Sequence, residues 1–205
     1  MTTHLDLELK GDGKWAAFPV WEDDDPQPWV ERVVDGYAKR RRVRCTPQER
    51  MVLVQSWSAM VEAVRSRRED EDRWMASAFG FVPMGSASAR DLIPMTVAHL
   101  TGVRAGRSRD GFVEDLVAPP AQRMGDPLVE ELATASGEAL RVRQLLLDPQ
   151  PDDEASVALS LVYVWESPLP DTVVALDAWF ALPDEGALVL PSFDALAATL
   201  TMRPS

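Results

Sequence analysis

The chain of 205 residues is 46% hydrophobic and 26% charged, with 33 acidic against 21 basic side chains and a formal net charge of −12 at pH 7. This length and apolar fraction predict one globular domain over residues 1–205 and exclude a chain that is disordered throughout. The lone Cys45 excludes a disulfide framework and a cysteine-based zinc site. No run approaches the roughly 18 apolar residues of a membrane-spanning helix, and Met1 to Lys10 contain no signal-peptide core, so we expect a cytoplasmic protein.

Residues 1–27 are predicted as an extended, acidic, tryptophan-rich segment. Leucines at alternate positions predict a short strand over residues 5–9. An acidic run before Pro26 is typical of a helix entrance, because carboxylates favour the positive end of a helix and proline fits its first position. Apolar residues at helical spacing then predict a first helix through Tyr37, with basic residues 39–42 at its C-terminal end.

The clearest helix start in the chain is a capping box, with Thr46 as N-cap, Pro47 at the first helical position and Glu49 at the third. Apolar residues from Leu53 to Val64 recur at helical intervals and form one apolar face. A second helix is therefore predicted directly after the first.

After the second helix the pattern changes to that of strands. Residues 74–82 and 92–100 are predicted as strands, and Pro94 indicates that the second of these is an edge strand or contains a bulge. Residues 112–117 are predicted as a short strand. Residues 126–132 fit either a helix start or a strand.

The last part of the chain is predicted as turn-linked strands followed by a helix. Strands are expected over residues 138–147, 157–165, 173–181 and 187–190, and a closing helix from Pro191. The second of these strands is apolar on both faces, which is typical of a central strand covered on both sides. Short turns imply antiparallel neighbours. The predicted fold class is therefore α+β: an antiparallel sheet with two N-terminal helices and a C-terminal helix packed on it.

Several short segments between residues 137 and 200 resemble those of a known fold group. The run 137–142 is a glycine turn followed by a strand with an outward arginine, and it is followed by the segments 161–165, 187–190 and 193–200. This succession resembles actinobacterial proteins that are similar to the PsbP-like α/β/α sandwich. The resemblance implies two helices before an antiparallel sheet, and a binding or assembly role without a shared catalytic motif.

Negative charge is concentrated in the second half of the chain. Residues 110–205 hold 17 of the 33 acidic side chains but only 4 of the 21 basic ones. Such a field repels nucleic-acid phosphates and anionic lipid, so we expect no nucleic acid and no membrane as partner. It favours a basic protein partner, or it serves solubility alone. The basic run 39–44 fits either a phosphate or nucleic-acid patch or charge that is favourable at a helix C-terminus, and the net charge of −12 favours the second.

No catalytic residue, cofactor or metal site is predicted. Of the two histidines, His4 lies in the terminal segment, and His99 continues an apolar strand face, which favours a hydrogen-bonded, partly buried residue. Cys45 follows basic residues that would lower its pKa, but no paired histidine is visible, so a structural position between the two helices is favoured. Asp177, midway along an apolar strand, is expected either to be buried or to face solvent at an edge.

The loop 102–111 is a candidate anion site. Its glycines surround Arg104, Arg107 and Arg109, and several guanidinium groups in one loop can clamp a carboxylate or a phosphate. The loop lacks the Gly-Lys-Ser/Thr ending of a P-loop and is not predicted to precede a helix, which disfavours a nucleotide site. A solvated hairpin tip is the other interpretation.

Seven tryptophans in a chain of this length point to protein contacts, because tryptophan is enriched at interface hot spots. Trp57, Trp74 and Trp165 fit core positions by their spacing. The tryptophans near the N-terminus lie in acidic, proline-rich sequence and are expected at the surface. The candidate partner contacts are therefore Trp15, Trp21, Asp23, Asp24, Asp25 and Trp29.

The leading hypothesis is a non-catalytic protein-binding module that engages another protein through this acidic, tryptophan-containing surface. An adaptor, a secretion chaperone, an assembly subunit and an immunity-type inhibitor of a basic protein all fit, the last by electrostatic complementarity. The alternative is a small-molecule-binding protein or enzyme with a pocket between sheet and helices that uses Arg104, Arg107 and Arg109. A self-assembling structural subunit is a third hypothesis. The sequence leaves partner identity and oligomeric state open.

Overall fold

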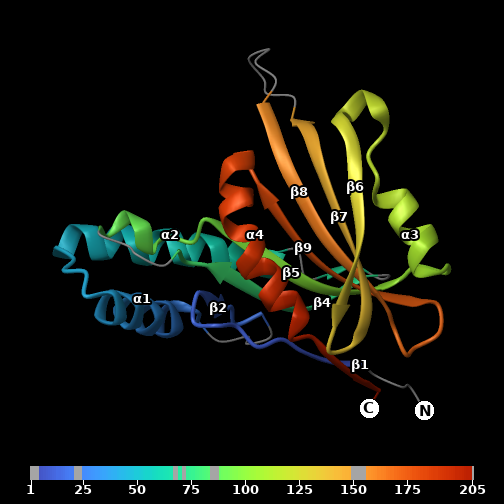
Figure 1. Ribbon diagram of the computed structural model, residues 1–205. Coiled ribbons are helices and arrows are strands. Elements are labelled where there is room, and N and C mark those ends of the chain that lie inside the picture. Colours follow the sequence, from blue (N-terminus) through green and yellow to red (C-terminus); the bar gives the residue numbers. More distant parts are fainter. Residues whose placement is uncertain are drawn as a thin grey trace.

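A broad antiparallel sheet occupies the centre of the computed structural model (Figure 1). Residues 5–20, 25–66, 69–70, 73–83, 88–148 and 156–204 are described. Within them the strands of this sheet are ordered β2-β4-β5-β9-β8-β7-β6, with β3 beside β4. Their bounds are β2 Trp15–Ala17, β3 Glu69–Asp70, β4 Arg73–Phe81, β5 Thr96–Arg104, β6 Arg123–Thr134, β7 Gly137–Asp148, β8 Ser156–Glu166 and β9 Thr172–Phe180.

Helices lie on both sides of this sheet (Figure 1). One helix comes from the C-terminal part of the chain, and the others precede β6. A separate ribbon joins the two ends of the described chain: β1 pairs antiparallel with β10, a strand that was not predicted. The bounds are α1 Gln27–Arg41, α2 Pro47–Ser66, α3 Arg109–Leu116, α4 Pro183–Ala198, the 3-10 turns η1 Arg90–Leu92 and η2 Pro120–Gln122, β1 Leu5–Glu8 and β10 Thr201–Pro204.

The strand register shows which helices share a face. Ala78, His99, Asp177, Val162 and Val142 lie side by side across β4, β5, β9, β8 and β7, so their side chains share one face. Ala78 packs in the cluster formed with α1 and α2, whereas Val162 and Val142 pack in the cluster that contains α3. These three helices therefore cover one face, and α4 covers the other.

The two N-terminal helices form as predicted. In the capping box the Glu49 N–H donates to Thr46 Oγ1 at 3.2 Å, and the Thr46 N–H donates to Glu49 Oε2 at 2.7 Å. These bonds satisfy donors that a helix start otherwise leaves open. Between the helices, Arg50 Nε donates to Asp35 at 2.9 Å, and this bond lowers the pKa of Asp35. No described helix is both long and apolar enough to cross a membrane.

The predicted α+β class is confirmed, as are most of the strands. The expected central strand is β8, which lies between β9 and β7, is buried along almost its whole length and contacts clusters on both faces. The strands expected over 74–82, 138–147 and 173–181 correspond to β4, β7 and β9. The ambiguous stretch 126–132 is strand β6.

The strand predicted over residues 112–117 is wrong, because these residues belong to α3. Ser108 caps this helix, its Oγ accepting from the Gly111 N–H at 3.3 Å. Val113 and Leu116 lie on the side of α3 that packs on the sheet, with the spacing of one helical turn. The arginine loop does lead into a helix, contrary to the prediction.

The strand predicted over residues 187–190 is also wrong, because it lies inside α4. A short apolar run fits a strand or a helix equally well. The decisive residues come before it: Pro183 in the first turn, followed by Asp184 and Glu185, is a helix start rather than a hairpin turn. Pro191, predicted to open the last helix, lies within it.

Neither alternative predicted from Pro94 is found: β5 is not an edge strand, and the irregularity in its pairing with β4 lies at Met75/Ser77. β5 begins at Thr96 and lies between β4 and β9, while residues 90–92 form η1. Pro94 is buried but precedes the strand, so it removes no hydrogen bond from the sheet.

Candidate binding groove

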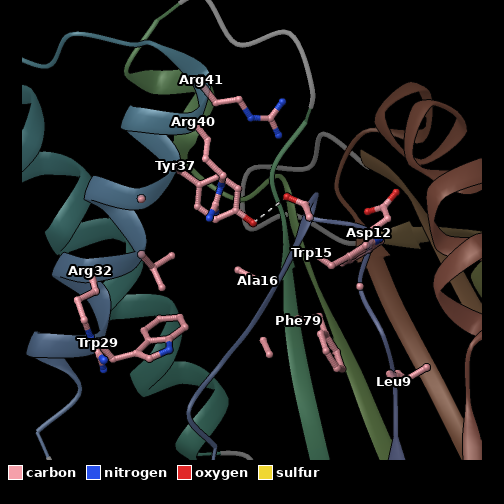
Figure 2. A pocket seen from close by; sticks show the side chains of 15 residues that line it. Leu9, Asp12, Trp15, Ala16, Trp29, Arg32, Tyr37, Arg40, Arg41 and Phe79 are labelled. Atoms are coloured by element: carbon pink, nitrogen blue, oxygen red, sulfur yellow. Dashed lines mark hydrogen bonds between the residues drawn. The ribbon is translucent and has the colours of Figure 1, made fainter.

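A groove of about 770 Å³ runs between α1 and the edge strand β2 (Figure 2). Helix α1 forms one wall. The other wall consists of β2, the chain before it and Phe79 of β4. Figure 2 shows Tyr37, Arg40 and Arg41 toward one end of the α1 wall and Trp29 and Arg32 toward the other.

One face of α1 supplies its wall. The lining residues recur at intervals of three or four, so they project from the same side of the helix. From first to last they extend over about 18 Å of helix axis at 1.5 Å per residue. They are Trp29, Arg32, Val33, Gly36, Tyr37, Arg40 and Arg41.

The opposite wall includes a sheet edge with no second strand among the described residues. The Lys14 carbonyl accepts from the Val82 N–H, and the Phe18 N–H donates to the Ala78 carbonyl, each at 2.8 Å. Residues 14, 16 and 18 therefore direct their backbone groups to β4, and by alternation the N–H and C=O of Ala17 point away from it. Ala17 is exposed and lines the groove, so these backbone groups are available there.

Tyr37 joins the two walls. Its hydroxyl donates to the Gly13 carbonyl at 3.4 Å, the dashed line in Figure 2. The Arg40 guanidinium lies 4.5 Å from the centre of the Tyr37 ring, and Arg41 Nη2 donates to the Val82 carbonyl at 3.3 Å. Burial raises the pKa of Tyr37, so it stays a protonated donor at neutral pH.

The groove is cationic although the protein carries a net charge of −12. Among the described residues, no carboxylate lies within ion-pair distance of Arg32, Arg40 or Arg41. Asp12 also lines the groove, but it pairs with Lys14 at 3.3 Å. Some arginines elsewhere are paired, such as Arg50 with Asp35 at 2.9 Å, Arg107 with Asp115 at 2.5 Å and Arg141 with Asp194 at 2.7 Å. Others, such as Arg44 and Arg104, are exposed cations without a described acidic partner, so it is the gathering of three such arginines in one groove that distinguishes this site.

The structure brings two of the predicted partner contacts to this groove. Trp29 is half-buried and packs edge-on against Trp57, with ring centres 6.0 Å apart. The predicted exposure of Trp15 is wrong, because this residue is only 5% exposed. Its Nε1 donates to the Ser192 carbonyl at 3.2 Å, and its side chain lies in the core behind the groove. Asp25 is exposed before α1 and accepts from the Gln27 N–H at 2.9 Å. Trp21, Asp23 and Asp24 lie outside the described residues.

The arginines of the predicted anion loop are not gathered around one site. Arg104 is exposed at the end of β5, and Arg107 pairs with Asp115. Arg109 pairs with Asp110 at 3.1 Å, and its Nη1 donates to the Glu138 carbonyl at 3.1 Å. None of the three lines the groove beside α1.

His99 and Cys45 are both at least half-buried. His99 is 9% exposed, with Nδ1 3.4 Å from Asp177 Oδ2, and Arg73 donates to the other oxygen at 3.3 Å. Asp177 is therefore half-buried on an interior strand rather than at an edge.

Cys45 is half-buried, and burial raises its pKa, so the thiol form is favoured. Within the described part of the chain, no three histidine, cysteine or acidic side chains are grouped to hold a metal. His4 is not among these residues.

Sequence reasoning missed a charged network beneath α4. Arg141, expected to point outward, turns toward the helix: its Nη1 donates to Asp194 at 2.7 Å and its Nη2 to Glu130 at 2.7 Å. The Tyr163 hydroxyl also donates to Asp194, and burial together with this bond raises the pKa of Tyr163. The network ties β6, β7 and β8 to α4.

The groove arginines were also missed, although the sequence holds a signal for them. Arg32 and Arg40 share the helical phase of Trp29 and Tyr37, which places cations among aromatic side chains on one face. Arg40 and Arg41 belong to the basic run 39–44, for which charge at the helix end was favoured over an anion-binding patch.

No protein-family model matches the sequence, and a search of curated proteins gives no significant match. The resemblance to PsbP-like proteins therefore stays a prediction. What the groove can bind follows from its own geometry and charge.

Proposed function

We propose that this protein is a protein-binding module that holds an acidic segment of a partner protein in the groove between α1 and β2. One observation carries the proposal: Arg32, Arg40 and Arg41 line the groove and have no carboxylate partner among the described residues. A guanidinium group presents a planar set of donors that matches a carboxylate, so an incoming acidic side chain supplies the missing partner.

The shape of the groove favours an extended peptide over a compact ligand. Its α1 wall is about 18 Å long, the length of about five or six extended residues at 3.3 Å each. The backbone N–H and C=O of Ala17, which point away from β4, can pair with a passing chain. Trp29 offers a flat apolar surface beside Arg32, toward one end of the groove.

This proposal keeps the expected class of function and changes the expected chemistry of the contact. The predicted surface was acidic and would attract a basic partner. Of its described residues, Asp25 is exposed before α1, while Trp15 and Trp29 border a cationic groove, which favours a partner of opposite sign. An adaptor, a secretion chaperone, an assembly subunit and an inhibitor all remain compatible with it.

Binding of a fluorescently labelled acidic peptide, Glu-Val-Glu-Leu-Glu-Val-Glu, tests the proposal by anisotropy. We expect saturable binding that Arg32→Gln/Arg40→Gln weakens about tenfold or more, because charge-assisted hydrogen bonds are lost. The matched control is Arg44→Gln/Arg104→Gln, which removes the same charge from exposed arginines outside the groove. It should change the affinity less than about twofold, as expected for surface charges.

Two results would contradict the proposal. Equal loss of affinity in both double variants would mean that the peptide senses only the overall charge. Displacement of the peptide by free glutamate at similar concentrations would mean that the groove is a site for small anions, as in the alternative hypothesis of a small-molecule-binding protein.

A further inference from the structure

The other edge of the sheet is also open. Strand β6 ends the strand order, and within the described chain β7 alone pairs with it. The pairing is irregular between Met124 and Leu128, where Gly125 has a φ of +78°, and it is regular from Leu128 to Thr134. This edge is at the far end of the sheet from the α1–β2 groove.

An apolar cleft lies beside this edge. It has a volume of about 320 Å³ and separates the start of β6 from the first turns of α4. Met124 is 54% exposed and Leu128 39%, so two large apolar side chains are accessible at the rim of the cleft. The apolar lining consists of Met124, Leu128, Leu145, Leu159, Ala187 and Leu190.

The segments that border the cleft carry an excess of carboxylates, although of these Asp126 alone lines it and Glu131, paired with Leu140, lies on the other face of the sheet. β6 and the first turn of α4 carry five of them and one guanidinium group, that of Arg123. Glu130 is neutralised by Arg141, and Asp126 lies 3.7 Å from Arg123, but no described cation pairs with Glu131, Asp184 or Glu185. One further cation, Arg143, lines the cleft, and the excess remains negative. The five carboxylates are Asp126, Glu130, Glu131, Asp184 and Glu185.

We propose that β6 and this cleft form a second docking surface, which binds an extended basic segment of another protein. The segment pairs with the regular part of the β6 edge and places one apolar side chain in the cleft. Charge selects the occupant. In a second copy paired antiparallel about residues 130–131, Glu130 would lie opposite Glu131, and like charges across a strand pair are destabilising, whereas lysine or arginine opposite them is favourable.

A labelled basic peptide, Lys-Val-Lys-Leu-Lys-Val-Lys, tests this surface in the full-length protein. Binding is followed by anisotropy, and the site is located by amide hydrogen exchange. We expect slower exchange in β6 on binding. We also expect Glu131→Lys, at an exposed position without a described partner, to weaken the peptide about fivefold, and Leu128→Ser to weaken it about as much.

The matched control is Glu114→Lys, which makes the same charge change on the exposed side of α3. It should alter the affinity less than about twofold. Equal weakening by Glu114→Lys and Glu131→Lys, or protection of amides outside β6, would overturn the proposal. So would a dimer of the free protein in which β6 is already protected, because a second copy would then occupy the edge. Circular dichroism of each variant verifies that it is folded.

Discussion

Both tyrosines of the chain are held as buried phenols beside arginines. Tyr37 lies between the walls of the groove under Arg40, and Tyr163 is fully buried and donates to Asp194, which Arg141 also binds. Burial raises the pKa of each, because an ionised phenol in these positions would lose its hydration. In the folded protein both hydroxyls therefore act as donors.

The raised pKa values predict a loss of stability at high pH. The unfolded tyrosines ionise near pH 10, whereas the folded ones keep their protons to higher pH. Their contribution to stability is complete below about pH 10 and is lost as the pH rises through the folded pKa values. In an alkaline titration, tyrosinate absorbance should appear together with the loss of the circular dichroism signal. Tyrosinate formation near pH 10 with native circular dichroism would show that the phenols are accessible.

At the scale of elements, two helical glycines have opposite surroundings. A Cβ added at Gly36 of α1 meets only Arg40 Nη1, at 3.8 Å, because this residue faces the groove. A Cβ added at Gly186 of α4 would lie 2.2 Å from Leu159 Cδ2 and 3.2 Å from Phe180 Cδ2. Glycine thus leaves open space in one helix and permits close approach to the sheet in the other.

The same substitution should therefore have opposite effects. Gly36→Ala should raise the free energy of unfolding by about 0.5–1 kcal/mol, because alanine loses less backbone entropy in a helix. Gly186→Ala should lower it by about 1–2 kcal/mol, because overpacking exceeds that gain. Urea denaturation of both variants measures the difference. Equal stabilisation by the two changes would mean that α4 moves away from the sheet at little cost.

At the scale of the whole molecule, the two proposed binding surfaces lie at opposite ends of one sheet. Six strand spacings separate β2 from β6, about 29 Å at 4.8 Å each. The cationic groove borders β2, while the half of the chain that follows residue 109 carries 17 acidic and 4 basic side chains. An acidic ligand is thus attracted by near charges and repelled by distant ones.

This separation predicts that salt changes the association rate of the acidic peptide in two directions. At about 0.01 M salt the Debye length is about 30 Å, so the distant carboxylates slow association; at about 0.1 M it is about 10 Å, and the groove arginines dominate. Near 1 M these are screened too. Stopped-flow measurements should show a rate that rises and then falls. In Arg32→Gln/Arg40→Gln the fall should be reduced, and a steady fall in the unsubstituted protein would exclude the long-range repulsion.

Local sequence signals were sufficient to predict the elements that interactions between residues close in the chain stabilise. The capping box of Thr46 and Glu49 predicted α2, because its bonds join residues three apart. The alternation over 157–165 predicted β8 as a strand covered on both faces. Predictions failed where a short apolar run fits two periods, as in α3 and in the first half of α4, since only packing on the sheet distinguishes a helix from a strand there.

The sequence by itself determined the α+β class, the two N-terminal helices and the concentration of negative charge in the second half. Only the tertiary structure decided the candidate sites. Arg32 and Arg40 border a groove because β2 comes to lie beside α1, and Arg141 turns inward because α4 presents Asp194 above it. The physical reason is that these contacts join segments distant in the chain, whose meeting depends on sheet pairing and on the burial of both faces rather than on local spacing.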